Sequence, residues 1–514
     1  MKTKLLLKSI AILVLVVLPF LSIAQHPIVD TKKGKIQGTT EKNIQIFKGI
    51  PFAAPPVGEL RWKAPQPVAA WENVKNCTAF GPSPMQGKPA PFLFWSKEYL
   101  IPESPISEDC LYLNVWTKST QNTAKMPVIV YIYGGGFRSG GSACPIYDGT
   151  ATAQKDVVFV SINYRVGVFG FLAHPELSAE HTKNTSGNYA LLDMIAALKW
   201  VQDNIASFGG DPNNVTIAGQ SAGAFAVNYL TASPLSAGLF HKAIAESGGS
   251  FLTPPNMPDF DLKAAEQQGV EFAKNLGASS LSALRQIDAD KILASQGGTS
   301  WPIIDGYVLP TAVYKTYKEG KQHDVPMLMG WNKDDLVFVG NKTAKEYKAD
   351  VQKKYGAMAD AFLREYPAHT DEEALASQKA LARDDAFGSQ VFTWAKMQTL
   401  TGTAPVYLYN FNRTTPYTNE DTNFGSFHSS EIVYAYNNLH TSDRPWEKID
   451  YYLAELMSTY WTNFATHGNP NGKELPKWKA YNNTDYKTLI IDTTVSSKNL
   501  PDLSKMKVWE QYSQ

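Results

Sequence analysis

Ser221 is the residue whose surroundings most clearly predict chemistry. It lies in Gly219-Gln220-Ser221-Ala222-Gly223, which matches the pattern G-x-S-x-G and directly follows the apolar run Val215–Ala218. A serine hydroxyl attacks carbonyl groups poorly unless it is exposed beside a base, and a sharp turn between a strand and a helix achieves this exposure. The backbone of such a turn is strained, and glycines are needed where a Cβ would clash. The pattern therefore predicts a nucleophilic serine, with an incidental turn as the alternative.

Backbone N–H groups near the serine predict a site for negative charge. Residues 224–230 can continue as a helix, so the N–H of Ala222 is expected at a helix N-terminus. A second set of donors comes from Gly134-Gly135-Gly136-Phe137, where three glycines suggest a chain that presents bare N–H groups. We expect Gly135, Gly136 and Ala222 to form an oxyanion hole. A flexible turn is the alternative, and a phosphate-binding loop is disfavoured because no Gly-Lys-Ser/Thr follows.

Alternating strands and helices must hold these groups in place. Three runs are apolar throughout, as strands buried on both faces of a parallel sheet would be: Val128–Ile132, Val157–Ile162 and Val215–Ala218. Between the last two, Tyr189–Ile205 carries apolar side chains at spacings of three and four, which predicts an amphipathic helix. Strand, helix and strand in this order imply right-handed crossovers in an open α/β sheet.

The later part of the chain extends this pattern. Met327–Met329 and Val406–Tyr409 predict further strands, and residues 342–383, rich in Ala, Lys and acidic residues, predict solvated helices. The sequence has no internal repeat, no low-complexity linker and no obvious domain seam. Residues 25–514 are therefore predicted to form a single catalytic domain.

Charge and composition exclude several classes of function. The 514 residues include 48 Lys or Arg and 48 Asp or Glu, a formal net charge of +0, so no global field draws the protein to nucleic acid or to an anionic membrane. The three cysteines are Cys77, Cys110 and Cys144, and neither C-x-x-C nor a Cys/His cluster occurs. We expect no metal ion, no cofactor and no nucleic-acid partner. The oligomeric state is left open.

The N-terminal segment predicts export. Positively charged residues up to Lys8 precede the apolar run Ser9–Ile23, and Ser22-Ile23-Ala24 offers small residues at the positions that determine cleavage. Residues 1–24 are therefore predicted to be a signal peptide, with an uncleaved anchor as the alternative. No later stretch has 18 consecutive apolar residues, so we expect a secreted or periplasmic protein without stable membrane insertion.

Several segments spread over nearly the whole mature chain resemble one family. Together with the elbow around Ser221, they are similar to the type-B carboxylesterase family, which includes the cholinesterases. The resembling segments are Gly49-Ile50-Pro51-Phe52-Ala53-Ala54-Pro55-Pro56, Leu60-Arg61-Trp62, Ser107-Glu108-Asp109-Cys110-Leu111-Tyr112-Leu113-Asn114-Val115-Trp116, the triple-glycine loop, Asn163-Tyr164-Arg165 and Phe208-Gly209-Gly210-Asp211-Pro212. The resemblance implies an α/β-hydrolase fold, with long loop insertions over the active site and a triad in the order Ser, acid, His.

The resemblance also implies which residues complete the triad. The acid of such proteins lies in an Asn-x-Asp-Glu segment after a strand, and Asn332-Lys333-Asp334-Asp335 puts Asp335 at that position, with Asp334 as the competitor. The histidine sits in a Gly-x-x-His segment, which Gly425-Ser426-Phe427-His428 matches. We therefore expect Ser221 as nucleophile, His428 as base and Asp335 as the acid that orients it.

Two departures from the family pattern bear on the expectations. Cholinesterases carry Glu immediately before the nucleophile, whereas this chain has Gln220, so choline esters are a poor fit. Relatives with a disulfide to the Cys110 position place its partner close before a Gln, and no Cys occurs there. A bridge from Cys77 is therefore left open, and Cys144 is expected to be a buried, inert thiol near the pocket.

The resemblance, together with the cost of burying an unpaired charge, predicts two ion pairs. Charges that lie among apolar residues are rarely buried unless they are paired. In related proteins the matching positions pair Arg61 with Glu108 and Arg165 with Asp193. The alternative is that each charged group reaches water separately.

The function predicted from these observations is hydrolysis of a small-molecule carboxylic ester through an acyl-enzyme, on short-chain or aryl esters. A lipase, thioesterase or amidase could use the same triad. A catalytically inactive adhesion homologue is the alternative from another class, although such proteins typically lose a triad residue. The residues that bind the substrate are not identified by the sequence.

Overall fold

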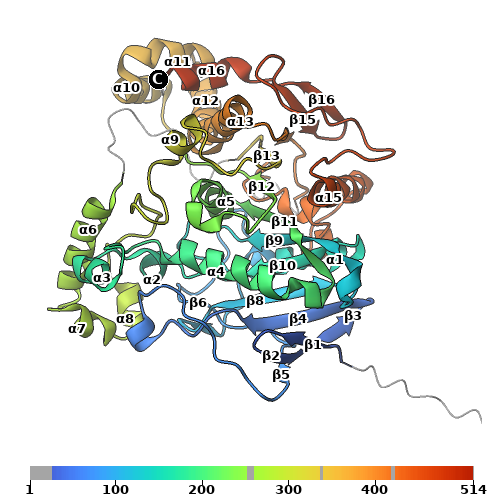
Figure 1. Ribbon diagram of the computed structural model, residues 1–514. Helices are drawn as coiled ribbons and strands as arrows, with labels where there is room; N and C mark the ends of the chain where they lie inside the picture. The colour runs from blue at the N-terminus through green and yellow to red at the C-terminus, as the bar shows by residue number, and fades with distance from the viewer. Residues whose placement is uncertain (1–25, 252–259, 336–339, 418–422, 513–514) are drawn as a thin grey trace, which may run out of the picture.

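The apolar runs identified above form the centre of an eleven-stranded sheet (Figure 1). The structure is a computed structural model that describes residues 26–251, 260–335, 340–417 and 423–512. The predicted signal peptide, residues 1–24, lies outside the described residues. The strands follow the spatial order β16 (Val495–Asn499), β15 (Lys487–Ile491), β14 (Val406–Phe411), β13 (Met327–Asn332), β12 (Lys242–Glu246), β11 (Gly210–Gln220), β9 (Met126–Ile132), β10 (Val158–Ile162), β8 (Tyr112–Thr117), β4 (Ile44–Pro51) and β3 (Thr39–Glu41).

The sheet is mixed and mostly parallel, as predicted. Strands β10, β9, β11, β12, β13, β14 and β15 pair in parallel with their neighbours. Strand β16 at one edge and strands β8, β4 and β3 at the other pair antiparallel. Every residue of β9 and β10 is buried, because helices cover both faces of the sheet and no face of these strands meets water.

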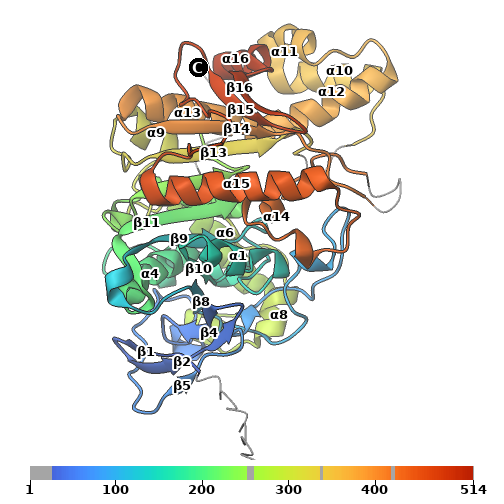
Figure 2. The same ribbon diagram turned by 90° about the vertical axis from the view of Figure 1, so that its right-hand side faces the viewer.

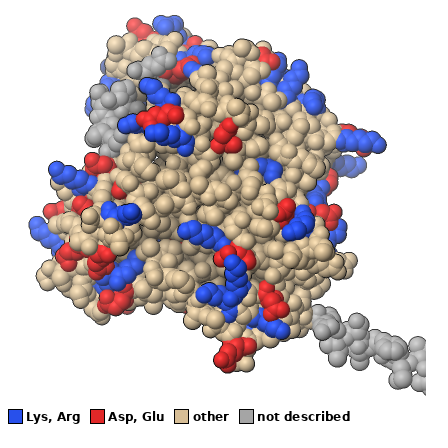
Figure 3. All heavy atoms as spheres, in the orientation of Figure 1, with Lys and Arg blue, Asp and Glu red and all other residues tan. Residues whose placement is uncertain are grey.

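The covering helices lie on opposite sides of the sheet. Helices α1 (Thr150–Gln154) and α15 (Lys448–His467) pack on one face, and α4 (Tyr189–Asn204) and α5 (Ala222–Ala232) on the other (Figures 1 and 2). The predicted helix Tyr189–Ile205 therefore differs from α4 by one residue. Among the described residues, none of the helices is both long enough and apolar enough to span a bilayer. Figure 3 shows basic and acidic side chains interspersed over the face that it presents, in keeping with the formal net charge of +0.

The segment predicted to form solvated helices forms three helices at one edge of the sheet. These are α10 (Ala344–Tyr355), α11 (Ala359–Glu365) and α12 (Asp371–Arg383) (Figure 1). They are less solvated than predicted, because each buries one face. The ring of Phe362 packs on Trp509 of helix α16 (Leu503–Tyr512), with their centroids 5.0 Å apart, and a helix at the far end of the chain thereby covers this face.

Both predicted ion pairs are present. Arg165 donates from Nε and Nη2 to the carboxylate of Asp193 at 2.8 and 2.7 Å, and their side chains are 3% and 0% exposed. Arg61 donates to the carboxylate of Glu108 at 2.6 and 2.5 Å in a setting that is nearly as buried. The prediction is confirmed: each guanidinium is paired where it would otherwise be an isolated buried charge.

The buried ion pair between Arg165 and Asp193 of α4 should stabilise the fold more than an exposed ion pair does. Replacing Asp193 with Asn leaves the Arg165 cation buried without its counter-charge, and the free energy of unfolding should fall by about 3–5 kcal/mol, measured by urea denaturation. Asp203 on the same helix pairs with Lys32 at the surface, with side chains 52% and 61% exposed. The control Asp203→Asn should cost less than about 1 kcal/mol. Equal losses in the two variants would contradict the prediction.

All three cysteines are free and buried, so the bridge between Cys77 and Cys110 is not formed. The two thiols lie in different surroundings: Cys77 Sγ is 4.0 Å from the carbonyl oxygen of Gly49, whereas Cys110 borders a small cavity with Arg61 and Arg165. Burial raises the pKa of Cys77 to about 11 and that of Cys144 to about 12. These thiols are therefore protonated and inert near neutral pH, as expected for Cys144.

Candidate active site

Ser221 occupies a strained turn between β11 and α5. Its backbone has φ +55° and ψ −125°, a conformation that non-glycine residues rarely adopt. A Cβ on Gly219 would lie 2.5 Å from the carbonyl carbon of Gly223, and one on Gly223 would lie 2.0 Å from the oxygen of Ile132. The two flanking glycines are therefore required by close backbone approach, for the reason inferred from the sequence.

The triple-glycine loop passes directly against this serine. A Cβ on Gly134 would lie 3.0 Å from Cβ of Ser221, and Gly135 and Gly136 have φ values of +115° and +62°. All three line the same pocket as Ser221. Ala222 is the first residue of α5, where helix N–H groups lack partners within the helix. The structure thus brings together the three residues expected to supply oxyanion donors.

The predicted acid and base are in direct contact. Nδ1 of His428 lies 2.5 Å from Oδ1 of Asp335, and the two side chains are 2% and 0% exposed. The other carboxylate oxygen of Asp335 accepts a hydrogen bond from the N–H of Asn332 at 3.1 Å. His428 lines the pocket together with Ser221. A carboxylate held on Nδ1 fixes the tautomer in which Nε2 is the proton acceptor, and this Nε2 lies 3.5 Å from Nε2 of Gln220.

Asp334, the competing acid, makes different contacts. Its carboxylate accepts hydrogen bonds from the N–H and the hydroxyl of Ser426 at 2.9 and 3.1 Å. Gly425 is needed beside it, because a Cβ there would lie 2.2 Å from the Asp334 carboxylate. The hydrogen bonds of Asp334 therefore hold the loop that carries His428 in place, whereas Asp335 contacts the imidazole ring of His428 itself.

An aromatic ring that sequence analysis did not identify lies over the base. Phe387 stacks on the imidazole of His428, with centroids 4.6 Å apart and planes 15° apart. Phe387 belongs to one π-helical turn, Asp384–Gly388, that continues α12. Such turns often occur at functional sites. No pattern in the sequence marks this contact, because the two residues are 41 positions apart and meet only through packing.

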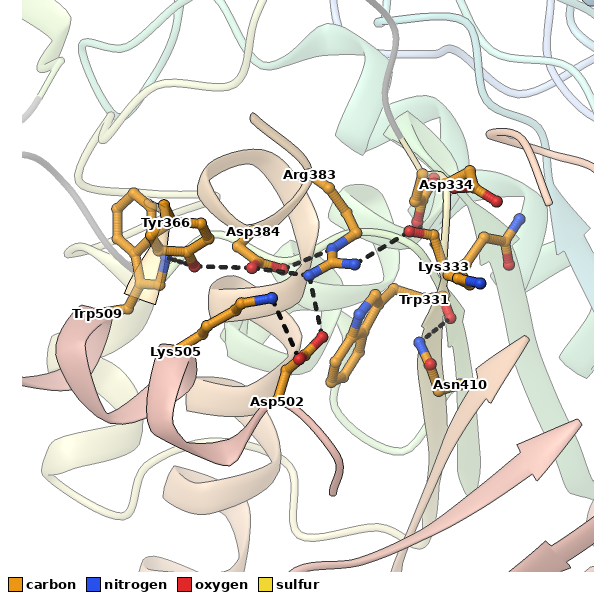
Figure 4. A network of polar contacts seen from close by, with 12 residues as sticks. Trp331, Lys333, Asp334, Tyr366, Arg383, Asp384, Asn410, Asp502, Lys505 and Trp509 are labelled. Atoms are coloured by element: carbon orange, nitrogen blue, oxygen red, sulfur yellow. Dashed lines mark hydrogen bonds and ion pairs between the residues drawn. The ribbon is translucent and has the colours of Figure 1, made fainter. Parts of the chain in front are cut away.

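The same π-helical turn is joined to the acid loop by a buried polar network (Figure 4). Arg383 donates to the carbonyl oxygen of Lys333 at 3.1 Å, beside Asp334 and Asp335, and pairs with Asp384 at 2.7 and 2.9 Å. Tyr366 in turn donates to Asp384 at 2.7 Å. The network therefore connects the loop carrying the acid with the turn carrying the ring that covers the base.

Two further carboxyl groups are buried near the acid. Burial raises the pKa of Glu246 to about 8, and burial together with the charges of Glu246 and Asp335 raises the pKa of Glu431 well above its usual value. Glu246 accepts from the indole N–H of Trp461 at 2.7 Å. Burial and the neighbouring acidic groups therefore disfavour a second negative charge beside Asp335.

The pocket in front of Ser221 has a volume of about 540 Å³. One wall is largely apolar and contains Phe92, Trp95, Tyr99, Leu100 and Ile101. Cys144 also lines the pocket, as its position after the glycine loop suggested. Within the ranges that the structure describes, no group of three or more His, Cys, Asp or Glu residues could hold a metal ion.

The chain is similar to known proteins along nearly its whole length. Residues 25–509 match the model of the carboxylesterase family. Over 482 residues the chain is 38% identical to fumonisin B1 esterase of Sphingopyxis macrogoltabida, covering 88% of this chain and 84% of that protein. Over 505 residues it is 34% identical to para-nitrobenzyl esterase of Bacillus subtilis strain 168, covering 93% and 98%.

Solved structures show the same similarity. A PNB esterase structure superposes with a TM-score of 0.80 at 32% identity, covering 95% of this chain and 99% of that chain. A carboxylesterase of Geobacillus stearothermophilus gives a TM-score of 0.79 at 30% identity, covering 94% and 99%. The fold is therefore the α/β-hydrolase fold expected from the resemblance, and the chain belongs to the carboxylesterase family, whose members here are named as hydrolases of carboxylic esters.

Proposed function

We propose that this carboxylic-ester hydrolase works through an acyl-enzyme formed on Ser221. One observation carries the proposal: a serine on a strained turn shares a pocket with a histidine whose Nδ1 contacts a buried carboxylate at 2.5 Å. A histidine that a carboxylate orients, facing the same pocket as a serine, can activate the hydroxyl group of that serine as a nucleophile.

The reaction proceeds in two steps at this site. Oγ of Ser221 bonds to the acyl carbon of the ester while Nε2 of His428 takes the hydroxyl proton, and Asp335 stabilises the imidazolium that forms. The N–H groups of Gly135, Gly136 and Ala222 stabilise the negative charge on the former carbonyl oxygen. As the C–O bond of the ester breaks, His428 gives its proton to the departing alcohol. Water then attacks the acyl carbon while His428 takes its proton. The bond to Oγ of Ser221 breaks, His428 returns the proton to Ser221, and the acid is released.

The pocket favours esters with an apolar or aromatic part. Gln220 precedes the nucleophile and is 2% exposed, and its neutral amide provides no negative charge that would attract a cationic substrate. The aromatic and aliphatic wall of the pocket instead suits short acyl chains and aryl groups. We also propose that the protein is exported, on the grounds of the charged and apolar segment in residues 1–24.

Labelling with a fluorophosphonate probe tests this proposal. An activated serine reacts with the probe, so the native protein should be labelled at Ser221, as shown by mass spectrometry of the modified peptide, and heat-unfolded protein should not. Turnover of 4-nitrophenyl butyrate should disappear as labelling proceeds. An unlabelled native protein that hydrolyses no ester would overturn the proposal and favour a catalytically inactive homologue.

A panel of substrates separates the chemistries that share a triad. Matched butyrate oxygen esters, thioesters and anilides should be hydrolysed fastest as oxygen esters. A lipase would show a jump in rate above the solubility limit of the substrate, which we do not expect. An anilide or thioester preferred by more than about tenfold would reassign the reaction within the family.

A further inference from the structure

Among the residues that the structure describes, the charged side chains that line the catalytic pocket are all of one sign. Lys88 and Arg138 line it, and no Asp or Glu within the described ranges does so. The chain as a whole contains equal numbers of acidic and basic residues, so its composition does not account for this bias. A cavity lined by one sign of charge attracts ligands of the opposite sign.

The two cations lie on segments that are fastened together beside the glycine loop. Gln86, only 5% exposed, donates from Nε2 to the carbonyl oxygen of Gly140 at 2.7 Å and accepts from the N–H of Gly140 at 2.8 Å. Lys88 is two residues beyond Gln86, and Arg138 is two residues before Gly140 and two after Gly136. The amide of Gln86 therefore holds both cation-bearing segments at the same rim of the pocket.

Neither cation is paired with a carboxylate in the part of the chain that the structure describes. Both side chains are exposed, and among the described residues no carboxylate forms an ion pair with either of them. Arg138 donates from Nε to the hydroxyl of Ser300 at 2.8 Å. That contact orients the guanidinium and leaves its two terminal nitrogens without a partner in the described part of the chain. A planar guanidinium presented in this way matches a carboxylate.

We propose that the substrate of this pocket is an ester that carries a free carboxylate group, bound by Arg138 with Lys88 beside it. The apolar wall takes the uncharged part, and the ester carbonyl lies between Ser221 and the glycine loop. The inference rests on the proposed hydrolysis at Ser221 and adds a substrate class to it. The carboxylate can belong to the acyl part or to the alcohol part, and the substrates below distinguish these placements.

Two pairs of esters isolate the effect of the charge. Mono-4-nitrophenyl glutarate and 4-nitrophenyl pentanoate have five-carbon acyl groups that differ in a terminal carboxylate. 3-Carboxyphenyl butyrate and phenyl butyrate differ in a carboxylate on the alcohol. One of the two pairs carries its carboxylate in the same part of the ester, acyl or alcohol, as the natural substrate. In that pair, Arg138→Gln should lower kcat/KM for the anionic ester about tenfold more than for the neutral one. Lys88→Gln should act in the same direction with a smaller effect, and Arg138→Lys should retain part of the preference.

Controls separate pocket charge from total charge. Lys199→Gln on α4 removes an exposed cation that does not line the pocket, and it should change neither ester. Raising ionic strength should lower the anionic-to-neutral ratio of the wild-type protein more than that of Arg138→Gln, because salt screens exposed charges.

The outcomes distinguish this inference from the proposed function. If Arg138→Gln and Lys88→Gln change both members of each pair equally, the substrate class is wrong and ester hydrolysis at Ser221 stands. If no ester is hydrolysed and the fluorophosphonate probe does not label Ser221, both proposals fail.

Discussion

Replacing Ser221 with Ala is expected to lower kcat for 4-nitrophenyl butyrate by a factor on the order of 10⁶. Alanine removes the only atom that can form the acyl-enzyme, and the oxyanion donors and the pocket then supply the small residual rate over water. The measurement is a steady-state assay, with labelling by the fluorophosphonate probe as a second readout that should vanish. Retention of more than about a tenth of the wild-type rate would rule out Ser221 as the nucleophile.

The fold of this variant should be intact, because only one oxygen is removed. Its thermal unfolding midpoint should therefore remain within a few degrees of the wild-type value. Ser279, which is exposed and lies outside the pocket, provides the matched substitution. Ser279→Ala should keep both full activity and full labelling, and a loss in that variant would show that the assay reports folding rather than chemistry.

Replacing Asp335 with Asn should lower kcat by about 10⁴-fold. The Asp335 carboxylate lies 2.5 Å from Nδ1 of His428, whereas an amide can favour the tautomer that turns the wrong nitrogen to the serine, and it does not stabilise the imidazolium. KM should change far less than kcat, because the residue is 0% exposed and does not touch the substrate pocket. Assays of kcat and KM on the purified variant check both parts.

Asp334→Asn is the matched comparison for this test. Asp334 accepts two hydrogen bonds from Ser426, whereas the carboxylate that is hydrogen-bonded to the imidazole belongs to Asp335. Its replacement should loosen the loop that carries His428 and cost far less in rate than Asp335→Asn. The opposite ranking would move the acid to Asp334.

The nucleophile and the glycine loop could be predicted from the sequence because backbone sterics within a few residues determine them. A Cβ at Gly219 or Gly223 would clash at once, so the requirement for glycine is visible in a five-residue pattern. The central strands could also be predicted from the sequence, because a strand that is buried on both faces forms a continuous apolar run. By contrast, β12 (Lys242–Glu246) was not predicted. This short strand is buried throughout, but the charged residues at its two ends interrupt the apolar pattern by which a buried strand is identified.

His428 and Asp335 could be named only through the family resemblance. They are 93 residues apart, and no local rule brings them together. The ion pairs Arg61–Glu108 and Arg165–Asp193 were predicted in the same way, from resemblance joined to the cost of burying a single charge. The resemblance left the bridge between Cys77 and Cys110 open, and the tertiary structure showed that the thiols are free.

The surroundings of the triad were decided by the tertiary structure alone. Phe387 reaches His428 because α12 continues into a π-helical turn, and Arg383, the last residue of α12, contacts the acid loop with its own side chain. The two cations at the pocket rim come from separate segments joined by the amide of Gln86. A short sequence pattern reflects only the backbone conformations that are possible within those few residues. Which distant side chains meet depends on how whole elements pack, and that information is spread over hundreds of residues.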